Sequence, residues 1–376
     1  MVRSLRRSTL PGAAALGCLL LLTACGHGGP APSDASPTPV RAARAPALLP
    51  VPRGEGSEAP DDFNGDGHRD LLLDDLVKAQ SHADDAGIGI VYGSSRGLVP
   101  GTRQLLTPKR YAAPADGQSP AVFETEATCD LDGDGFTDLV VTTDPPYDGH
   151  LSYLRGPFTR KGAPREAAAP LASPGEAPTG PAADVNRDGY DDLVVRASAG
   201  PGKAYVVLGG PDGPTRTGAT LPAGTDVALG ALGRGKALDA AVATASGTAL
   251  RHDLPTAIPG TPSTLDTTAP TLHAADLDGD GLSELITADS GVRLLPGSAT
   301  GPTTKGSVTL NPASKGAPQI LAAADFDGDG RADLVLRTVR GETTDTVEIH
   351  PGAAKAALVT PKPSLTFSTS QFLPRP

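Results

Sequence analysis

The sequence of 376 residues contains no tryptophan, one methionine and 3% aromatic residues, which excludes a core built around large aromatic rings. The core must come instead from leucine, valine, isoleucine and alanine, and this favours thin β-strands. Beyond the N-terminal region, no apolar stretch is long enough to span a bilayer. No His-Glu-x-x-His motif occurs, and no pair of carboxylates outside the loops described below stands out as a catalytic pair. These absences favour a non-catalytic β protein.

Cysteine and net positive charge are also lacking. Of the three cysteines, Cys18 lies in the N-terminal apolar segment and Cys25 follows that segment directly. Cys129 is the one cysteine that follows this N-terminal region, so we expect no disulfide within the rest of the chain. It precedes an aspartate where other repeats carry alanine, which indicates a small packed side chain. The formal net charge of −11 argues against binding to nucleic acid.

The N-terminus is typical of a secretory signal, because Arg3, Arg6 and Arg7 precede an apolar segment. The segment ends in Leu22-Thr-Ala-Cys25, which resembles a bacterial lipobox. We therefore predict a signal peptide over residues 1–24, a lipid on Cys25 and attachment to the extracellular face of the bacterial membrane. The alternative is an ordinary cleaved signal and a secreted protein. Residues 25–60 are rich in Gly, Pro, Ala and Ser, which predicts a lipid-anchored tether.

One acidic template, Asp-x-(Asp/Asn)-x-Asp-Gly-x-x-(Asp/Glu), occurs five times between residues 62 and 333. Oxygen-bearing side chains stand at positions 1, 3, 5 and 9, and the glycine at position 6 permits the positive φ that bends the backbone around an ion. The position 7 carbonyl is the natural fifth ligand. Calcium accepts roughly six to eight oxygen ligands in loose geometry, whereas zinc prefers His and Cys.

The sequence therefore predicts about five calcium sites. With position 7 contributing its carbonyl, the predicted ligands are Asp62, Asn64, Asp66, His68 and Asp70; Asp130, Asp132, Asp134, Phe136 and Asp138; Asp184, Asn186, Asp188, Tyr190 and Asp192; Asp276, Asp278, Asp280, Leu282 and Glu284; and Asp325, Asp327, Asp329, Arg331 and Asp333.

An EF-hand loop begins in the same way but needs a glutamate at position 12 and a helix on each side. The residues at position 12 here are Leu73, Val141, Val195, Thr287 and Leu336. The segments after the loops are short, β-prone apolar runs. We therefore expect these loops to connect strands.

A sixth copy, Ala231 to Asp239, keeps the length and the closing acid but has lost the other acidic residues, which predicts a metal-free loop of the same shape. It also contains Gly230-x-x-x-x-Gly235-Lys236. Because Ala237 replaces the Ser or Thr that a phosphate-binding loop needs, nucleotide binding is not expected.

The six motifs start at residues 62, 130, 184, 231, 276 and 325, and a spacing of about 50 residues is typical of propeller or solenoid units. Each unit offers a strand of small residues before the loop, an apolar strand after it and a third strand. Glycine pairs such as Gly93 and Gly97 mark a hairpin turn to a fourth strand. The predicted fold is an all-β β-propeller of four-stranded blades with calcium loops, with six blades and seven as the alternative.

The loop, the Asp-Leu-hydrophobic strand after it and the Tyr-Gly-Ser-Ser-x-Gly-Leu segment at 92–98 resemble FG-GAP or VCBS repeats, known from the β-propeller of integrin alpha subunits. The resemblance implies a calcium-binding propeller over residues 61–376 that binds a protein or carbohydrate on one face, as an adhesion-type module. The alternative is an extracellular enzyme, or an accessory subunit, that acts on carbohydrate or another cell-surface polymer. The first unit departs from the pattern, because little strand-like sequence precedes its loop.

Two further groups of residues have structural interpretations. The aromatic residues around the second repeat are interpreted as loop anchors, with a ligand-binding face as the alternative; they are Tyr111, Tyr147, Tyr153 and Phe158. The histidines outside the N-terminal region are interpreted as surface or turn residues; they are His68, His82, His150, His252, His273 and His350.

Overall fold

The computed structural model describes residues 48–78, 81–112, 123–143, 150–158, 169–170, 179–196, 202–212, 216–233, 235, 237–254, 263–289, 291–312, 314–339 and 345–373. Residues Ala45–Pro376 form one compact unit of the chain. None of the helices in the described ranges has the length and apolar character needed to cross a membrane.

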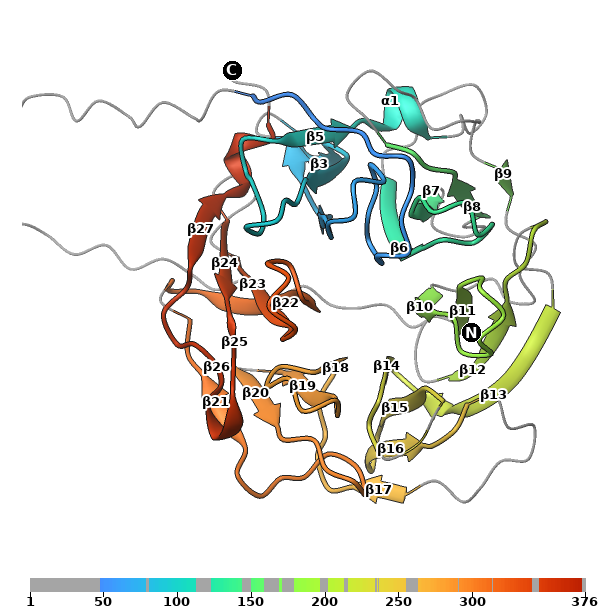
Figure 1. Cartoon of the computed structure of the whole chain (residues 1–376), viewed down its shortest axis with the longest axis vertical. Coiled ribbons are helices and arrows are strands. Elements are labelled where there is room, and N and C mark those ends of the chain that lie inside the picture. Colours follow the sequence, from blue (N-terminus) through green and yellow to red (C-terminus); the bar gives the residue numbers. More distant parts are fainter. Residues whose placement is uncertain are drawn as a thin grey trace, which may run out of the picture. The chain divides into compact units, whose positions relative to one another are not determined.

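Six antiparallel sheets surround a central cavity, so the prediction of a six-bladed β-propeller is confirmed (Figure 1). Each blade is built from consecutive strands of the chain. Blade 1 contains β1 (Leu71–Leu73), β4 (Ile88–Val91) and β5 (Arg103–Leu106). Blade 2 contains β6 (Phe123–Cys129), β7 (Asp138–Thr143), β8 (His150–Leu154) and β9 (Ala169–Pro170). Blade 3 contains β10 (Thr179–Ala183), β11 (Asp192–Arg196), β12 (Gly202–Leu208) and β13 (Arg216–Gly224).

The second half of the ring repeats this order. Blade 4 contains β14 (Asp226–Gly230), β15 (Asp239–Thr244), β16 (Gly247–Arg251) and β17 (Ser263–Leu265). Blade 5 contains β18 (Thr271–Ala275), β19 (Glu284–Ala288), β20 (Val292–Leu295) and β21 (Val308–Leu310). Blade 6 contains β22 (Ala317–Ala324), β23 (Asp333–Val339), β24 (Thr346–His350) and β27 (Leu365–Ser368).

Short elements decorate the first and last blades. They are the hairpin β2 (Val77–Lys78) and β3 (Ser81–Asp85), the hairpin β25 (Gly352–Ala353) and β26 (Leu358–Val359), the helical turn α1 (Pro108–Tyr111), and the 3₁₀ turns η1 (Lys355–Ala357) and η2 (Thr369–Gln371). The sequence pattern did not predict these hairpins, because neither has the alternating apolar residues of a blade strand.

The strand after each loop is buried on both faces, which explains its continuous apolar sequence. In β7, Leu139 and Val141 pack into a cluster with blade 1, while Val140 packs into a cluster with blade 3. In β11, Val194 turns toward the opposite neighbour and joins a cluster with blade 4. The core is therefore a series of apolar layers between adjacent blades.

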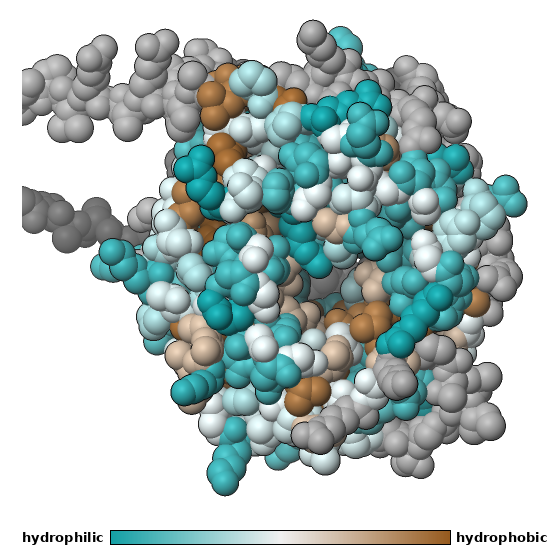
Figure 2. Space-filling model, in the orientation of Figure 1, coloured by the Kyte–Doolittle hydropathy of each residue, from teal (hydrophilic) through white to brown (hydrophobic). Residues whose placement is uncertain are grey.

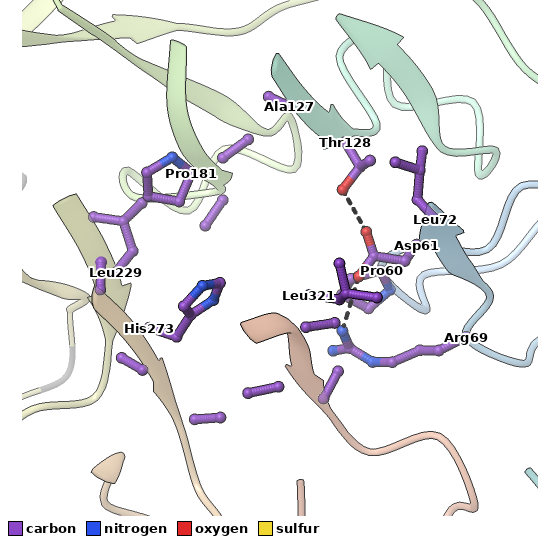
Figure 3. A pocket seen from close by; sticks show the side chains of 18 of the residues that line it. Pro60, Asp61, Arg69, Leu72, Ala127, Thr128, Pro181, Leu229, His273 and Leu321 are labelled. Atoms are coloured by element: carbon purple, nitrogen blue, oxygen red, sulfur yellow. Dashed lines mark hydrogen bonds and ion pairs between the residues drawn. The ribbon is translucent and has the colours of Figure 1, made fainter. Parts of the chain in front are cut away.

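Blade 1 departs from the four-stranded plan. Its first strand, β1, follows the loop, and no strand among the described residues precedes that loop on the cavity side. Pro60 and Asp61 line the cavity at this place (Figure 3). The weak strand signal before Asp62 is thus explained by an irregular segment in place of an inner strand.

Side chains join blade 6 to blade 1. Arg337 forms a buried ion pair with Asp345 at 2.7 Å and donates to the carbonyls of Asp74 and Asp75 at 2.8 and 2.9 Å. On the other side of the same junction, Arg103 donates to the carbonyl of Gln371 at 3.0 Å. An apolar cluster shared by β1, β22, β23, β24 and β27 also joins the two blades.

Candidate metal centres on the propeller loops

Each loop lies between the first and second strands of a blade, or directly before β1 in blade 1, and winds around the side chain at position 1. In the loop at 276, the backbone N–H groups of Gly279 and Asp280 donate to Asp276 Oδ1 at 2.7 and 3.1 Å, and that of Gly281 donates to Asp276 Oδ2 at 2.8 Å. One carboxylate thus receives three hydrogen bonds from its own loop. The turn is therefore closed by hydrogen bonds from the backbone at positions 4, 5 and 6 to the position 1 carboxylate.

Glycine at position 6 has the positive φ that the sequence predicts, between +82° and +90° in the five loops. Position 4 also has a positive φ, with Gly133 at +69° and Gly279 at +78°. Arg187 occupies this position in the third loop at +62°, a conformation that costs free energy in a residue with a Cβ. The second left-handed residue was not predicted, although the frequent glycine at position 4 was a signal for it.

Three of the five predicted loops bring carboxylates together. In each, oxygen atoms of the residues at positions 1, 3 and 9 lie within 4.8 Å of one another. The three sets are Asp130, Asp132 and Asp138; Asp276, Asp278 and Glu284; and Asp325, Asp327 and Asp333.

The position 9 acid is buried and bridges two parts of its blade. Asp138 accepts the backbone N–H of Leu131 through Oδ2 at 3.2 Å and that of Gly156, after the third strand, through Oδ1 at 2.9 Å. Glu284 repeats this arrangement with Leu277 and Gly297, at 2.7 and 2.9 Å. The same residue therefore belongs to the acidic cluster and fixes the loop to the strand pair behind it.

Burial next to other carboxylates makes these acids difficult to ionise. Burial, followed by the charges of Asp132 and Asp130, raises the pKa of Asp138 from 3.8 to about 8. Burial likewise raises the pKa of Glu284 to about 7, and burial with the charge of Asp327 raises the pKa of Asp333 to about 7. A cation that compensates the negative charge stabilises the ionised form of such a carboxylate.

The donor set fits calcium. Every side chain in the three clusters offers carboxylate oxygen, without sulfur or imidazole, as a hard cation requires. Asp132 is 10% exposed, and its Oδ1 atom is buried without a hydrogen-bond partner among the described residues. Its Oδ2 atom lies 3.4 Å from Arg155 Nη1. An orphaned acceptor within a carboxylate cluster is the environment that a cation satisfies.

The loops at 62 and 184 have asparagine at position 3, so they lack a third carboxylate at that place. Asn64 donates from Nδ2 to Asp66 at 3.1 Å, and Asn186 donates to Asp188 at 3.0 Å. The amide Oδ1 of each accepts the backbone N–H of position 5, as Asp278 Oδ1 does in the loop at 276. The backbone turn is therefore shared by all three loops.

Position 5 plays a different part from positions 1, 3 and 9. Its carboxylate accepts the backbone N–H of position 7 in each of the five acidic loops, for example at 2.8 Å from Leu282 to Asp280. In the loop at 325 the position 5 acid, Asp329, is also paired with the guanidinium of Arg331. The ligand roles predicted for position 5 and for the position 7 carbonyls stay predictions.

The fourth loop shows which features do not depend on acidic ligands. Asp239, at position 9, is buried and accepts the backbone N–H of Asp253 at 2.9 Å, as its counterparts do in the other blades. His252 Nδ1 lies 3.2 Å from Asp239 Oδ2. A Cβ on Gly233, at position 3, would lie 3.1 Å from the ring of His252. The ring thus stands where other loops place a position 3 side chain.

Four pairs of neighbouring loops are hydrogen-bonded in the same direction, in which the N–H of position 8 donates to the position 1 carbonyl of the preceding loop. The bonds are Thr137 to Asp62 at 3.1 Å, Asp191 to Asp130 at 3.1 Å, Ser283 to Ala231 at 2.8 Å and Ala332 to Asp276 at 2.7 Å. Burial raises the pKa of Asp191 to about 6. Backbone hydrogen bonds therefore connect the first three loops to one another and the last three loops to one another.

The central cavity, of about 1080 Å³, is bordered by the inner strands and is visible as a hollow in the ring (Figure 2). Pro181, Leu229 and Leu321 line it together with several alanines, and His273 projects into it (Figure 3). Burial lowers the pKa of His273 to about 4, so its imidazole is neutral at pH 7. The strands predicted before the loops are therefore the innermost strands, with small residues such as Ala183, Ala275 and Ala324 lining the cavity.

Several single-residue interpretations can now be compared with the structure. Cys129 is buried in an apolar cluster, as expected for a packing residue. Tyr111 and Phe158 are buried too, which confirms the anchoring interpretation for both, whereas Tyr147 lies outside the described residues. The surface interpretation is wrong for His350, which is fully buried with Nδ1 at 3.0 Å from the carbonyl of Thr360.

The turn from Gly93 to Gly97 spells Gly-Ser-Ser-Arg-Gly, the letters of a nucleophile elbow. The turn connects the antiparallel strands β4 and β5, and Ser95 is exposed on it. A nucleophile elbow requires a strand-to-helix turn, so this match lacks its structural context.

Residues 130–195 and 276–336 match the family model of the FG-GAP-like repeat. With six blades arranged around an axis, the protein is a β-propeller in which these two segments are similar to the FG-GAP-like repeat. A comparison with curated proteins finds no match.

Several solved structures are similar. One is a lectin of Agrocybe aegerita described as recognising non-reducing terminal N-acetylglucosamine, with 14% identity and a TM-score of 0.44, covering 85% of this chain and 78% of that chain. Another is the V. cholerae biofilm matrix protein Bap1, with 13% identity and a TM-score of 0.33, covering 86% of this chain but only 43% of that chain. A third is BBS1N in complex with ARL6DN, with 14% identity and a TM-score of 0.39, covering 85% and 84%.

Proposed function

We propose that this protein is an exported β-propeller, stabilised by calcium, that acts as a non-catalytic binding module at the cell surface. The observation that carries the proposal is the recurrence of one carboxylate cluster, at the same loop positions, in blades 2, 5 and 6. Random acidic turns do not repeat with one spacing and one set of backbone hydrogen bonds. The recurrence therefore supports the assignment of these clusters as calcium sites.

The calcium ion would supply two positive charges to each cluster. Within the protein, the position 1 carboxylate shapes the turn, and the position 9 acid connects that turn to the third strand. Both acids are held close to other negative groups, so compensation of their charge stabilises the blade as well as the loop. Dissociation constants of about 10⁻⁴ to 10⁻³ M are expected for such extracellular sites. We include the loops at 62 and 184, with asparagine oxygen at position 3, which gives about five ions.

The proposed location depends on the N-terminal sequence, which lies outside the described residues. Residues 1–24 would direct export, the lipid on Cys25 would hold the protein at the membrane, and the following residues would connect it to the propeller. Replacement of Cys25 by serine is expected to move the protein from the membrane fraction to the medium. Retention in the membrane after this replacement would exclude the lipid as the anchor.

The binding partner proposed is a protein or a carbohydrate that contacts one face of the ring. Propellers present the loops of all blades together on a face, which creates a broad surface from short segments. Screening the protein against glycans and surface proteins, with calcium and with a chelator, tests this part of the proposal. A calcium-independent hydrolytic activity on a surface polymer would favour the enzyme alternative instead.

Calorimetric titration of the metal-stripped protein, followed by thermal melting, tests the calcium sites. We expect about five ions and a large rise in Tm. Asp276→Asn, at position 1 of its loop, should remove one ion, whereas Asp289→Asn, at an exposed position outside the loops, should leave the number unchanged. Absence of calcium binding, with an unchanged melt, would refute the assignment.

A further inference from the structure

The first loop differs from the others because an N-terminal segment lies directly over it. Residues 52–57, here called the strap, pass across the loop at 62 and reach the loop at 130. Gly54 N–H donates to the carbonyl of Asn64 at 3.0 Å, and Gly56 N–H donates to that of Gly65 at 3.2 Å. The strap is thus paired with the loop backbone.

The strap also contacts predicted ligands. The Ser57 hydroxyl donates to Asp62 Oδ2 at 2.6 Å, and Asn64 donates from Nδ2 to the carbonyl of Pro52 at 3.1 Å. Ser57 N–H donates to the carbonyl of Gly135 in the second loop at 2.7 Å. One short segment therefore holds the side chains at positions 1 and 3 of the first loop and joins that loop to its neighbour.

Burial follows from this arrangement. Asp62 and Asn64 are both 0% exposed. In the loops at 184, 276 and 325, by contrast, the position 1 residues Asp184, Asp276 and Asp325 are only half-buried. A cation at the first loop would have to pass the strap, while the other three loops are open.

The contact is too close for side chains larger than hydrogen. A Cβ on Gly54 would lie 1.6 Å from the carbonyl oxygen of Gly65, and one on Gly65 would lie 2.2 Å from the Phe136 ring. The strap packs on the first loop at Gly54, and the first loop packs on the second loop at Gly65. Alanine at position 54 must therefore lift the strap, since the opposing atom belongs to the backbone.

We propose that the strap closes the first calcium loop and controls the exchange of its ion, with Ser57 as a residue that positions Asp62. The proposal rests on the proposed function, because it requires calcium in these loops. The strap lies near the end of residues 25–60, the segment that the sequence assigns to the tether. Displacement of the strap opens the first loop while the open loops at 276 and 325 keep their own geometry.

Stopped-flow mixing of the calcium-loaded, full-length protein with excess chelator measures the exchange. We expect one ion to leave more slowly than the others. Gly54→Ala should abolish the slow phase, and Ser57→Ala should accelerate it by about tenfold, since it removes a hydrogen bond to a charged group. Ser57→Thr should restore the slow phase because it keeps the hydroxyl.

Gly291→Ala is the matched control, since no atom lies within 4 Å of a Cβ at Gly291. This variant should release calcium like the natural protein. A slow phase that persists in Gly54→Ala and Ser57→Ala, or a natural protein that releases all ions at one rate, would overturn the strap proposal and leave the calcium sites intact. A protein that binds no calcium would overturn the proposed function as well.

Discussion

Removal of calcium should make the stability of this protein fall as the pH rises. Asp138 is buried in the second loop, and burial raises its pKa from 3.8 to about 8. Between these values the folded, metal-free protein keeps a proton that the unfolded chain has released. Folding then takes up a proton, so the free energy of unfolding decreases with increasing pH.

The magnitude follows from the same linkage. Within this window the free energy of unfolding falls by about 1.4 kcal/mol per pH unit for each such group. Asp138 alone should therefore lower the free energy of unfolding by about 3 kcal/mol between pH 5 and pH 7. Glu284 and Asp333, whose pKa values are raised to about 7, add to this loss in the same range. For a domain of this size, 3 kcal/mol corresponds to a decrease in Tm of roughly 4 °C.

The assay is thermal and urea denaturation at pH 5, 6, 7 and 8, with a chelator and with saturating calcium. With calcium the carboxylates are bound in their charged form, so the gain from calcium should grow as the pH rises. Asp138→Asn should reduce the pH dependence of the metal-free protein, whereas Asp289→Asn should not. A metal-free protein whose stability is constant or increases from pH 5 to pH 7 would refute the reasoning.

Two further predictions concern residues outside the acidic clusters. Asp239→Asn should destabilise blade 4. The carboxylate accepts the N–H of Asp253 through one oxygen and places the other 3.2 Å from His252 Nδ1, and the amide keeps only one of these two oxygens. Calorimetry should find the same number of calcium ions. An unchanged melting temperature would show that the position 9 acid is dispensable. Arg337→Ala should cost about 3–5 kcal/mol in urea denaturation, since it leaves buried Asp345 without its charged partner. A loss below about 1 kcal/mol would show that the junction of blades 1 and 6 does not depend on this pair.

The sequence could predict the loops because oxygen-bearing residues at fixed spacing leave few other geometries. The number of blades followed from counting motif starts, including the fourth, where only the length and Asp239 remained. The continuous apolar runs after each loop, such as Leu139 to Val141, predicted strands that are buried on both faces. Local pattern was sufficient wherever one short segment determined its own environment.

Local sequence patterns could not predict contacts between segments that are far apart in the chain. The position 9 acids bind N–H groups well along the chain, as Asp70 does with Gly93, and no spacing rule indicates that partner. The strap has no hydrophobic period, because it is held by backbone hydrogen bonds to the carbonyls of Asn64, Gly65 and Gly135. His350 was misjudged for a similar reason, since the carbonyl that satisfies it belongs to Thr360, on the far side of the inserted hairpin.

The junction between blades 6 and 1 has a consequence for how such a protein can be rearranged. Both ends of the described chain meet the same short segment, since Leu49 N–H donates to Gly101 at 2.8 Å and Arg103 donates to Gln371. Every blade is a contiguous stretch of sequence, so the ring has no obligatory first blade. Linking the two ends and cutting a connection between other blades would preserve each sheet. Circular permutation, and gain or loss of whole blades in evolution, are changes that this architecture readily accommodates.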